Sequence, residues 1–259
     1  MKLVYILSQG HSGSTLTDCI LGTHPDFISS GELRYLNWQL KRTEEVKATV
    51  SAQNICTCEH DFRECDYWSK VFKKIKAKTG KDIVARPESF DTAYFGKFAY
   101  QERNGFNRRF FDKAKGYLFR EWLERGNTLN YISWLEPKVK TWVKNNWLLY
   151  ESMAEVAQKR VVVDSSKDLL IALLMQYYKP QDVYILFLHR SALGLAASYK
   201  KWSAKKNKPF EISSVIQDKQ KFENRVKKYK TLKNLKYLDV NYEDIVAKPS
   251  EFIEKVVEK

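Results

Sequence analysis

The chain has 259 residues, of which 44% are hydrophobic and 14% aromatic, so it can build a sizeable core and is not intrinsically disordered. Its formal net charge of +14 favours polyanionic partners such as nucleotides, nucleic acid, anionic glycans or acidic peptides, without choosing among them. No apolar run reaches the ~18 residues of a membrane span, and residues 1–7 are too short for a signal peptide. We therefore expect a cytoplasmic protein, or one from which a leader has been removed.

The first predicted elements are a strand, a loop, a helix and a second strand. Residues 2–7 form a continuous apolar run typical of a buried strand, and the Gly- and Ser-rich residues 8–14 follow as a loop. A helix is predicted over residues 15–21 and a short strand over 27–30. The apolar residues of this helix share one face: Leu16, Cys19 and Ile20.

A second run of alternating strands and helices begins near residue 160. The predicted strands cover residues 161–163, 183–188 and 236–240, and the predicted helices cover 169–178, 192–202 and 249–257. Strands that alternate with helices imply a parallel sheet with right-handed crossovers. We therefore expect an α/β protein with a P-loop-like, three-layer fold around a central parallel sheet.

Between these two runs, residues 66–159 have helical patterns and few strand signals, so we expect one domain over residues 1–259 with a helical insertion there. Residues 97–160 carry 13 Lys and Arg against 7 Asp and Glu. The mixed aromatic and basic residues 106–119 are typical either of a single-stranded nucleic-acid surface or of the core of this insertion, and the helical spacing favours the core.

The loop after the first strand is typical of a phosphate site. It reads Gly10-His11-Ser12-Gly13-Ser14-Thr15 and leads into a helix. Glycines let consecutive backbone amides point inward, and the helix N-terminus adds partial positive charge. The ATPase pattern G-x-x-x-x-G-K-[ST] fails, because Ser14 stands at its Lys position and Ser8 at its first Gly. The missing Lys disfavours a kinase or an ATPase.

Other loops should meet this one, because ligands of open parallel sheets bind beyond the carboxyl ends of the strands. Residues 164–168 and 189–191 follow two further predicted strands. The second loop carries Arg190, and Ser198 follows eight residues later in a predicted helix. A guanidinium and a hydroxyl at this spacing can hold one phosphate from two sides, although an ordinary surface Arg and a helical Ser would give the same pattern.

Several further motifs accompany these loops: His24-Pro25, Gly31-Glu32, Leu188-His189-Arg190 with Ser198-Tyr199, and Val240 to Val246 with Pro249. Together with the loop at 10–15, they resemble the sulfotransferase family that uses 3′-phosphoadenosine 5′-phosphosulfate (PAPS). The resemblance covers residues 3–34, 56–68 and 160–253, and the sequences of the first loop and of the segment from Cys56 to Trp68 are similar to a bacterial-type branch.

The resemblance implies how the donor is held. The residues Gly10, His11, Ser12, Gly13, Ser14 and Thr15 would bind the 5′-phosphosulfate, and Arg190 with Ser198 would bind the 3′-phosphate. Most relatives carry Arg or Lys in place of His11, which is expected here to donate to the bridging or sulfonyl oxygen in a manner that depends on its protonation. Relatives also close a basic loop over the nucleotide; here that role falls to residues among Lys200 to Lys208 or to a longer chain.

The resemblance also implies catalytic residues. Glu32 matches the catalytic Glu that follows a Gly in tyrosylprotein and related carbohydrate sulfotransferases, so we expect it to take the acceptor's proton. Its alternatives are helix capping and an ion pair with Arg34. Lys167 looks like the family lysine that supports the transferring sulfonyl group, with an ion pair to Asp164 or Asp168 as its alternative. His11 is the third expected catalytic residue.

Three of the four cysteines lie close in sequence, at Cys56, Cys58 and Cys65. Together with His60 they raise the possibility of zinc, but their spacing is not that of a standard zinc finger and zinc has no part in sulfonyl transfer. A loop anchor, or a disulfide of the Cys58–Cys65 type, is favoured, and no metal is expected.

The sequence therefore predicts a PAPS-dependent sulfotransferase that acts on a hydroxyl-bearing acceptor, with an anionic glycan or an acidic peptide as candidates. Two alternatives remain: a nucleotide kinase of similar topology, and a nucleic-acid-binding protein without catalysis. The first requires the absent Lys, and the second requires salt-sensitive binding of oligonucleotides. We expect no nucleic-acid partner.

Overall fold

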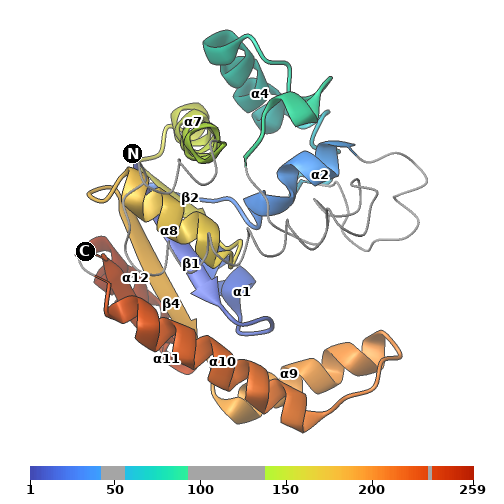
Figure 1. The fold of residues 1–259 in the computed structure, drawn as a ribbon, viewed down its shortest axis with the longest axis vertical. Helices are drawn as coiled ribbons and strands as arrows, with labels where there is room; N and C mark the ends of the chain where they lie inside the picture. Colours follow the sequence, from blue (N-terminus) through green and yellow to red (C-terminus); the bar gives the residue numbers. More distant parts are fainter. Residues whose placement is uncertain (42–55, 93–137, 233–234) are drawn as a thin grey trace. The chain divides into compact units, whose positions relative to one another are not determined.

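The computed structural model describes residues 1–41, 56–92, 138–232 and 235–259, and within them the chain divides into two compact units (Figure 1). One unit combines residues 2–31 with 161–259, and the other covers residues 32–160 together with Met1. The helical unit thus begins at Glu32, before the insertion predicted over 66–159. The predicted aromatic and basic segment 106–119 lies outside the described residues.

The first unit is built on a five-stranded parallel sheet in the order β2-β3-β1-β4-β5, which confirms the predicted α/β class. Its strands are β1 (Lys2–Ser8), β2 (Phe27–Ser29), β3 (Val161–Asp164), β4 (Val183–His189) and β5 (Tyr237–Asn241). β1 lies at the centre, with Val4 paired to Val163 on one side and to Tyr184 on the other. A central parallel strand is covered on both faces, which explains why residues 3–7 of β1 are all apolar or aromatic.

Helices cover both faces of this sheet and complete three layers. The helices of this unit are α1 (Ser14–Leu21), α8 (Leu169–Tyr178), α9 (Ala192–Lys205), α10 (Ile212–Lys230), α11 (Tyr242–Ala247) and α12 (Pro249–Val257). On one face Val4 and Ile6 pack in a cluster with Leu21 of α1 and Phe252 of α12. On the other face α8 packs against β1 and β4 (Figure 1), and the Asp168 amide donates to the hydroxyl of Tyr5 (3.3 Å).

The apolar face of α1 is largely exposed. Leu16 and Cys19 are exposed and Ile20 is half-buried, whereas the buried residues of α1 are Ser14, Thr17, Asp18 and Leu21. A mainly polar helix face is buried here because it meets the loops at the strand ends, where its oxygens have hydrogen-bond partners.

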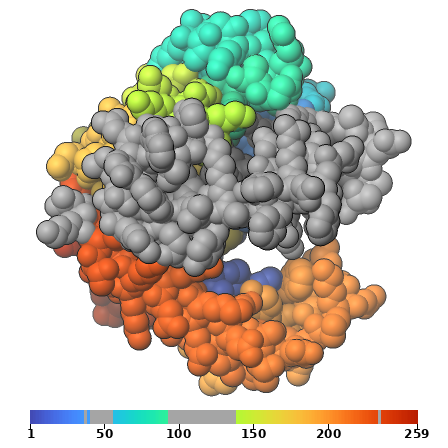
Figure 2. Space-filling model, in the orientation of Figure 1, coloured from blue at the N-terminus to red at the C-terminus, as the bar shows by residue number. Residues whose placement is uncertain are grey.

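α9 and α10 pack against each other and form the surface that is orange in Figure 2. Neither the 19-residue α10 nor the short α11 was predicted from the sequence. The Lys residues of the 200–208 segment are exposed on this surface, and Lys208 lies over the ring of Trp202, 5.2 Å from its centroid. Their predicted part in closing over the nucleotide stays a prediction.

The second unit is helical where it is described. It contains η1 (Leu33–Tyr35), α2 (Leu36–Lys41), α4 (Asp66–Thr79), η2 (Pro87–Ser89) and α7 (Val139–Ala157). α4 packs on α7, where the Tyr67 hydroxyl donates to the Met153 carbonyl (3.2 Å) and Lys78 pairs with Glu155 (2.9 Å). None of the helices in the described ranges is both long and apolar enough to cross a membrane.

Candidate functional site

The loop between β1 and α1 has the backbone of an anion-binding turn. His11 (φ 62°) and Gly13 (φ 90°) both adopt left-handed conformations. At Gly13 a Cβ would lie 2.2 Å from ring carbons of Tyr242, so only glycine can stand there. The Gly13 carbonyl accepts the amide and the hydroxyl of Thr17 (3.0 and 3.1 Å). The N-cap residue of α1 is Gly13, which has no side chain to cap the first-turn amides, and amides at such a helix start favour an anion.

Two cations reach this loop from neighbouring strand ends. Lys167, after β3, donates from Nζ to Ser14 Oγ (3.2 Å), and Arg190, after β4, donates from Nη1 to the carbonyl of His11 (2.8 Å). The carboxylates named as alternative partners of Lys167 both accept backbone amides: Asp164 from Ser166 (2.7 Å), and Asp168 from the first turn of α8 (2.9 and 3.2 Å). The structure thus brings the three predicted loops together at one edge of the sheet.

The third basic residue is His11 itself. Its ring packs against Tyr199 and Trp202 of α9, with centroids 4.3 and 5.4 Å apart. Burial lowers the pKa of His11, and the charges of Lys167 and Arg190 lower it further. The lowered pKa favours the neutral form of the imidazole near pH 7.

The segment that follows β5 positions the guanidinium of Arg190. Its Cζ lies 4.2 Å from the ring centroid of Tyr242. Glu243 accepts the amide of Ser191 (3.0 Å), and Ser191 in turn caps α9. Burial alone would raise the pKa of Glu243, but the hydrogen bonds from Ser191 and the charge of Arg190 leave it below its usual value. Tyr242 and Glu243 thus support the site, a role that the sequence motif did not reveal.

Asp18 on α1 is a further residue that the sequence analysis missed. Its Oδ2 accepts the amide of Gly31 (2.9 Å) and the hydroxyl of Ser165 (3.1 Å), so it ties the ends of β2 and β3 to α1. Burial raises the pKa of Asp18 to about 6, although hydrogen bonds from Ser29, Ser165 and Gly31 oppose this shift. The signal in the sequence was an Asp within a short helix between two buried strands.

The raised pKa of Asp18 predicts a pH-dependent stability. The folded state keeps the proton of the Asp18 carboxyl up to about pH 6, whereas the unfolded chain loses it near pH 3.8. The free energy of unfolding therefore falls as the pH rises between these values. The full difference corresponds to about 3 kcal/mol of unfolding free energy. Asp18→Asn should remove this part of the slope in urea unfolding measured from pH 4 to pH 7. The exposed Asp218→Asn should keep it, and parallel pH curves for wild type and Asp18→Asn would contradict the assignment.

The other predicted donor-binding residues lie in or near the same loop, but the contacts expected of them are not all seen. Ser12 is buried in the loop, and on the first turn of α1 Ser14 is buried and Thr15 is exposed. Ser198 is half-buried on α9, one residue before the Tyr199 that contacts His11, and its pairing with Arg190 stays a prediction.

Glu32 is the first residue of the helical unit. It follows Gly31, whose carbonyl accepts the amide of Ser165 (2.9 Å) at the end of β3. Within its own unit Glu32 pairs with Arg34 (3.4 Å), which is one of its two alternative roles. It precedes η1 without a capping hydrogen bond from its side chain to the described residues, so the other alternative is not seen. Its catalytic role stays a prediction.

Comparison with known proteins identifies the family. A sulfotransferase domain from the curacin biosynthetic pathway matches with 15% identity and a TM-score of 0.46, over 99% of this chain and 72% of that domain. A sulfotransferase domain from the olefin synthase of Synechococcus PCC 7002 matches with 16% identity and a TM-score of 0.44, over 99% and 71%. None of the curated proteins that were compared matches. The family model described as "Sulfotransferase family" matches residues 4–259, and the chain therefore belongs to the sulfotransferase family.

Proposed function

We propose that this chain transfers a sulfonyl group from PAPS to an acceptor hydroxyl. Family membership makes it a transferase of the sulfotransferase type, and the choice of donor is supported by the loop between β1 and α1. The observation that carries the proposal is that Lys167 and Arg190 both contact this loop, while the lysine of an ATPase loop is replaced by Ser14. Such a loop suits the single phosphate and the sulfonyl group at the 5′ end of PAPS, which carry less charge than a triphosphate.

The fit to an anionic nucleotide is supported by the state of Arg190. Its Nε is buried and forms no hydrogen bond with any residue that the structure describes. A buried donor left in this state has a free-energy cost that an incoming phosphate oxygen would relieve. In the proposed complex Arg190 and Ser198 hold the 3′-phosphate, and residues 10–15 hold the 5′-phosphosulfate.

In the proposed reaction the acceptor oxygen attacks sulfur in line with the departing phosphate. The bond between sulfur and the bridging oxygen breaks, and its electron pair stays on the phosphate of adenosine 3′,5′-bisphosphate. Glu32 takes the proton of the acceptor hydroxyl. Lys167 and His11 donate to the sulfonyl and bridging oxygens, where negative charge grows. His11 can do so as a cation only once the bound anion has raised its pKa, which lies low in the free protein.

Titration calorimetry without Mg²⁺ tests the donor. Adenosine 3′,5′-bisphosphate is expected to bind in the micromolar range, and AMP, which lacks the 3′-phosphate, at least about tenfold more weakly. ATP should not compete. Tighter binding of ATP than of the bisphosphate would favour a kinase. Oligonucleotide affinity that falls steeply with salt, without PAPS binding, would favour the nucleic-acid alternative.

A further inference from the structure

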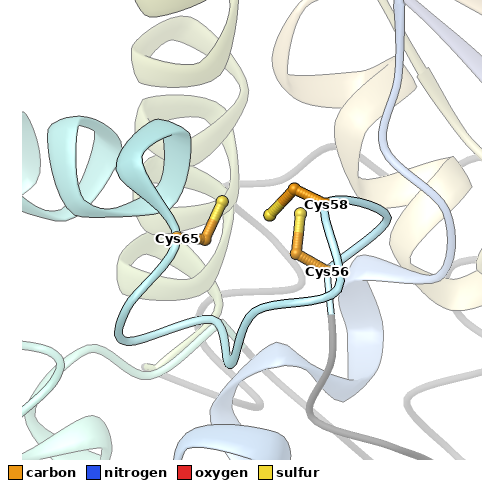
Figure 3. Close-up of side chains that lie close together, drawn as sticks. All are labelled: Cys56, Cys58 and Cys65. Atoms are coloured by element: carbon orange, nitrogen blue, oxygen red, sulfur yellow. The ribbon is translucent and has the colours of Figure 1, made fainter.

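Three thiols of the helical unit converge outside the site described above. The Sγ atoms of Cys56, Cys58 and Cys65 all lie within 4.8 Å of one another, and Figure 3 shows the three side chains directed toward a common point. Cys65 is buried, Cys56 is half-buried and Cys58 is exposed, and all three are free thiols. No metal was expected from the sequence because the spacing of the cysteines is not that of a standard zinc finger, but the folded chain brings the three sulfurs together.

Two tight turns build this convergence. In the first, the Cys56 amide donates to the His60 carbonyl (2.8 Å) and the Glu59 amide donates to the Cys56 carbonyl (2.9 Å), with Glu59 in a left-handed conformation (φ 67°). In the second, the Cys65 amide donates to the Asp61 carbonyl (2.9 Å). Because these backbone bonds hold the three residues, the thiols are positioned before any ligand arrives, which lowers the cost of binding one.

The number of thiols favours a metal over a disulfide. A disulfide would use two sulfurs and leave the third beside them without a bond, whereas a metal ion uses all three. In a tetrahedral site with metal–sulfur bonds of about 2.3 Å, neighbouring sulfurs lie ~3.8 Å apart, so the thiols need to close by about 1 Å at most. Three soft sulfur ligands select zinc over hard cations such as Mg²⁺ or Ca²⁺.

We propose that Cys56, Cys58 and Cys65 bind one Zn²⁺ through their three sulfurs, with solvent in the fourth position. His60 lies in the same turn, where its Nδ1 contacts the Cys58 carbonyl (2.7 Å), and the cluster found within the described residues contains only the three cysteines as ligands. This proposal is independent of the donor and of the mechanism proposed above.

The role of such a zinc would be structural. Cys65 is the residue that immediately precedes α4, and α4 packs on α7. In the sequence Phe62 lies between Cys58 and Cys65. Its ring meets that of Trp68 of α4 edge to face, with centroids 5.3 Å apart, and Trp68 stacks on Phe72 with centroids 5.5 Å apart. Zinc would therefore fix the 56–65 turns against the first part of α4, because an ion that binds only the folded state stabilises it.

Metal analysis of the whole chain tests this proposal. Protein made in zinc-containing medium and purified without chelator is expected to carry one zinc per chain by mass spectrometry. Cys58→Ser should lose most of it, and it is the first variant to use because Cys58 is exposed and its replacement should not disturb packing. Cys19→Ser, an exposed cysteine of the other unit, is the matched control and should keep its zinc. His60→Ala should also keep it.

Cobalt substitution and heating give two further readouts. Protein reloaded with Co²⁺ should show a sulfur-to-cobalt charge-transfer band that Cys58→Ser lacks, and EDTA should lower the Tm of the wild type but not of this variant. Zinc held equally by wild type and Cys58→Ser, or a disulfide between two of the three cysteines in freshly purified protein, would overturn the proposal. Loss of zinc in His60→Ala would contradict the proposed solvent ligand and would show His60 to be the fourth ligand.

Discussion

Replacing Arg190 with Ala should weaken the binding of adenosine 3′,5′-bisphosphate by about 30- to 1,000-fold, or ~2–4 kcal/mol. The guanidinium is held in place before the nucleotide arrives, by its bond to the His11 carbonyl and by the ring of Tyr242. A group fixed in this way loses little entropy on binding, so most of its charged contact with a phosphate contributes to affinity.

Two comparison variants isolate this effect. Arg225→Ala removes the same charge from an exposed position on α10, so it reports the loss of general attraction and should change affinity little. Arg190→Lys keeps the charge but loses the planar fork, and its affinity should lie between those of wild type and Arg190→Ala. Thermal unfolding shows whether each variant is folded. If folded Arg190→Ala bound the bisphosphate within about threefold of wild type, Arg190 would not hold the nucleotide.

Most of the sheet could be predicted from the sequence because β1, β3 and β4 are short apolar runs, each with a loop at its carboxyl end. α8 and α12 begin and end where they were predicted, since α8 is apolar almost throughout and α12 starts at Pro249. α10 was missed because it is strongly charged and only Val215, Val226 and Tyr229 are buried along its length. Such a sparse apolar stripe is hard to distinguish from a solvated segment.

The candidate site could be predicted as far as its loops. Parallel strands place their carboxyl ends at one edge, so Lys167 and Arg190 were expected near residues 10–15, and both contact that loop. The supporting residues could not be predicted in this way. Tyr242 meets Gly13 and Arg190 only because β5 pairs with β4, and Asp18 faces inward only because its oxygens meet the ends of two other strands.

Glu32→Gln should lower turnover by about 10²- to 10⁴-fold while leaving the affinity for adenosine 3′,5′-bisphosphate unchanged. The amide keeps the size and much of the hydrogen bonding of the carboxylate but cannot accept the acceptor's proton. Turnover can be followed as transfer of label from PAPS to an acceptor chosen from a screen of hydroxyl compounds. Release of adenosine 3′,5′-bisphosphate in the absence of an acceptor reports transfer to water. Glu88→Gln, at an exposed position of the same unit, is the matched control.

The ion pair between Glu32 and Arg34 provides the decisive comparison. If Glu32 acts only by holding Arg34, then Arg34→Gln breaks the same pair and should reduce turnover as strongly as Glu32→Gln. If Glu32 accepts the proton, Arg34→Gln keeps the carboxylate and should retain most of the turnover, while Glu32→Gln should not. Equal losses in the two variants, or a loss of bisphosphate affinity in Glu32→Gln, would therefore make Glu32 a positioning residue, and another group would have to take the proton.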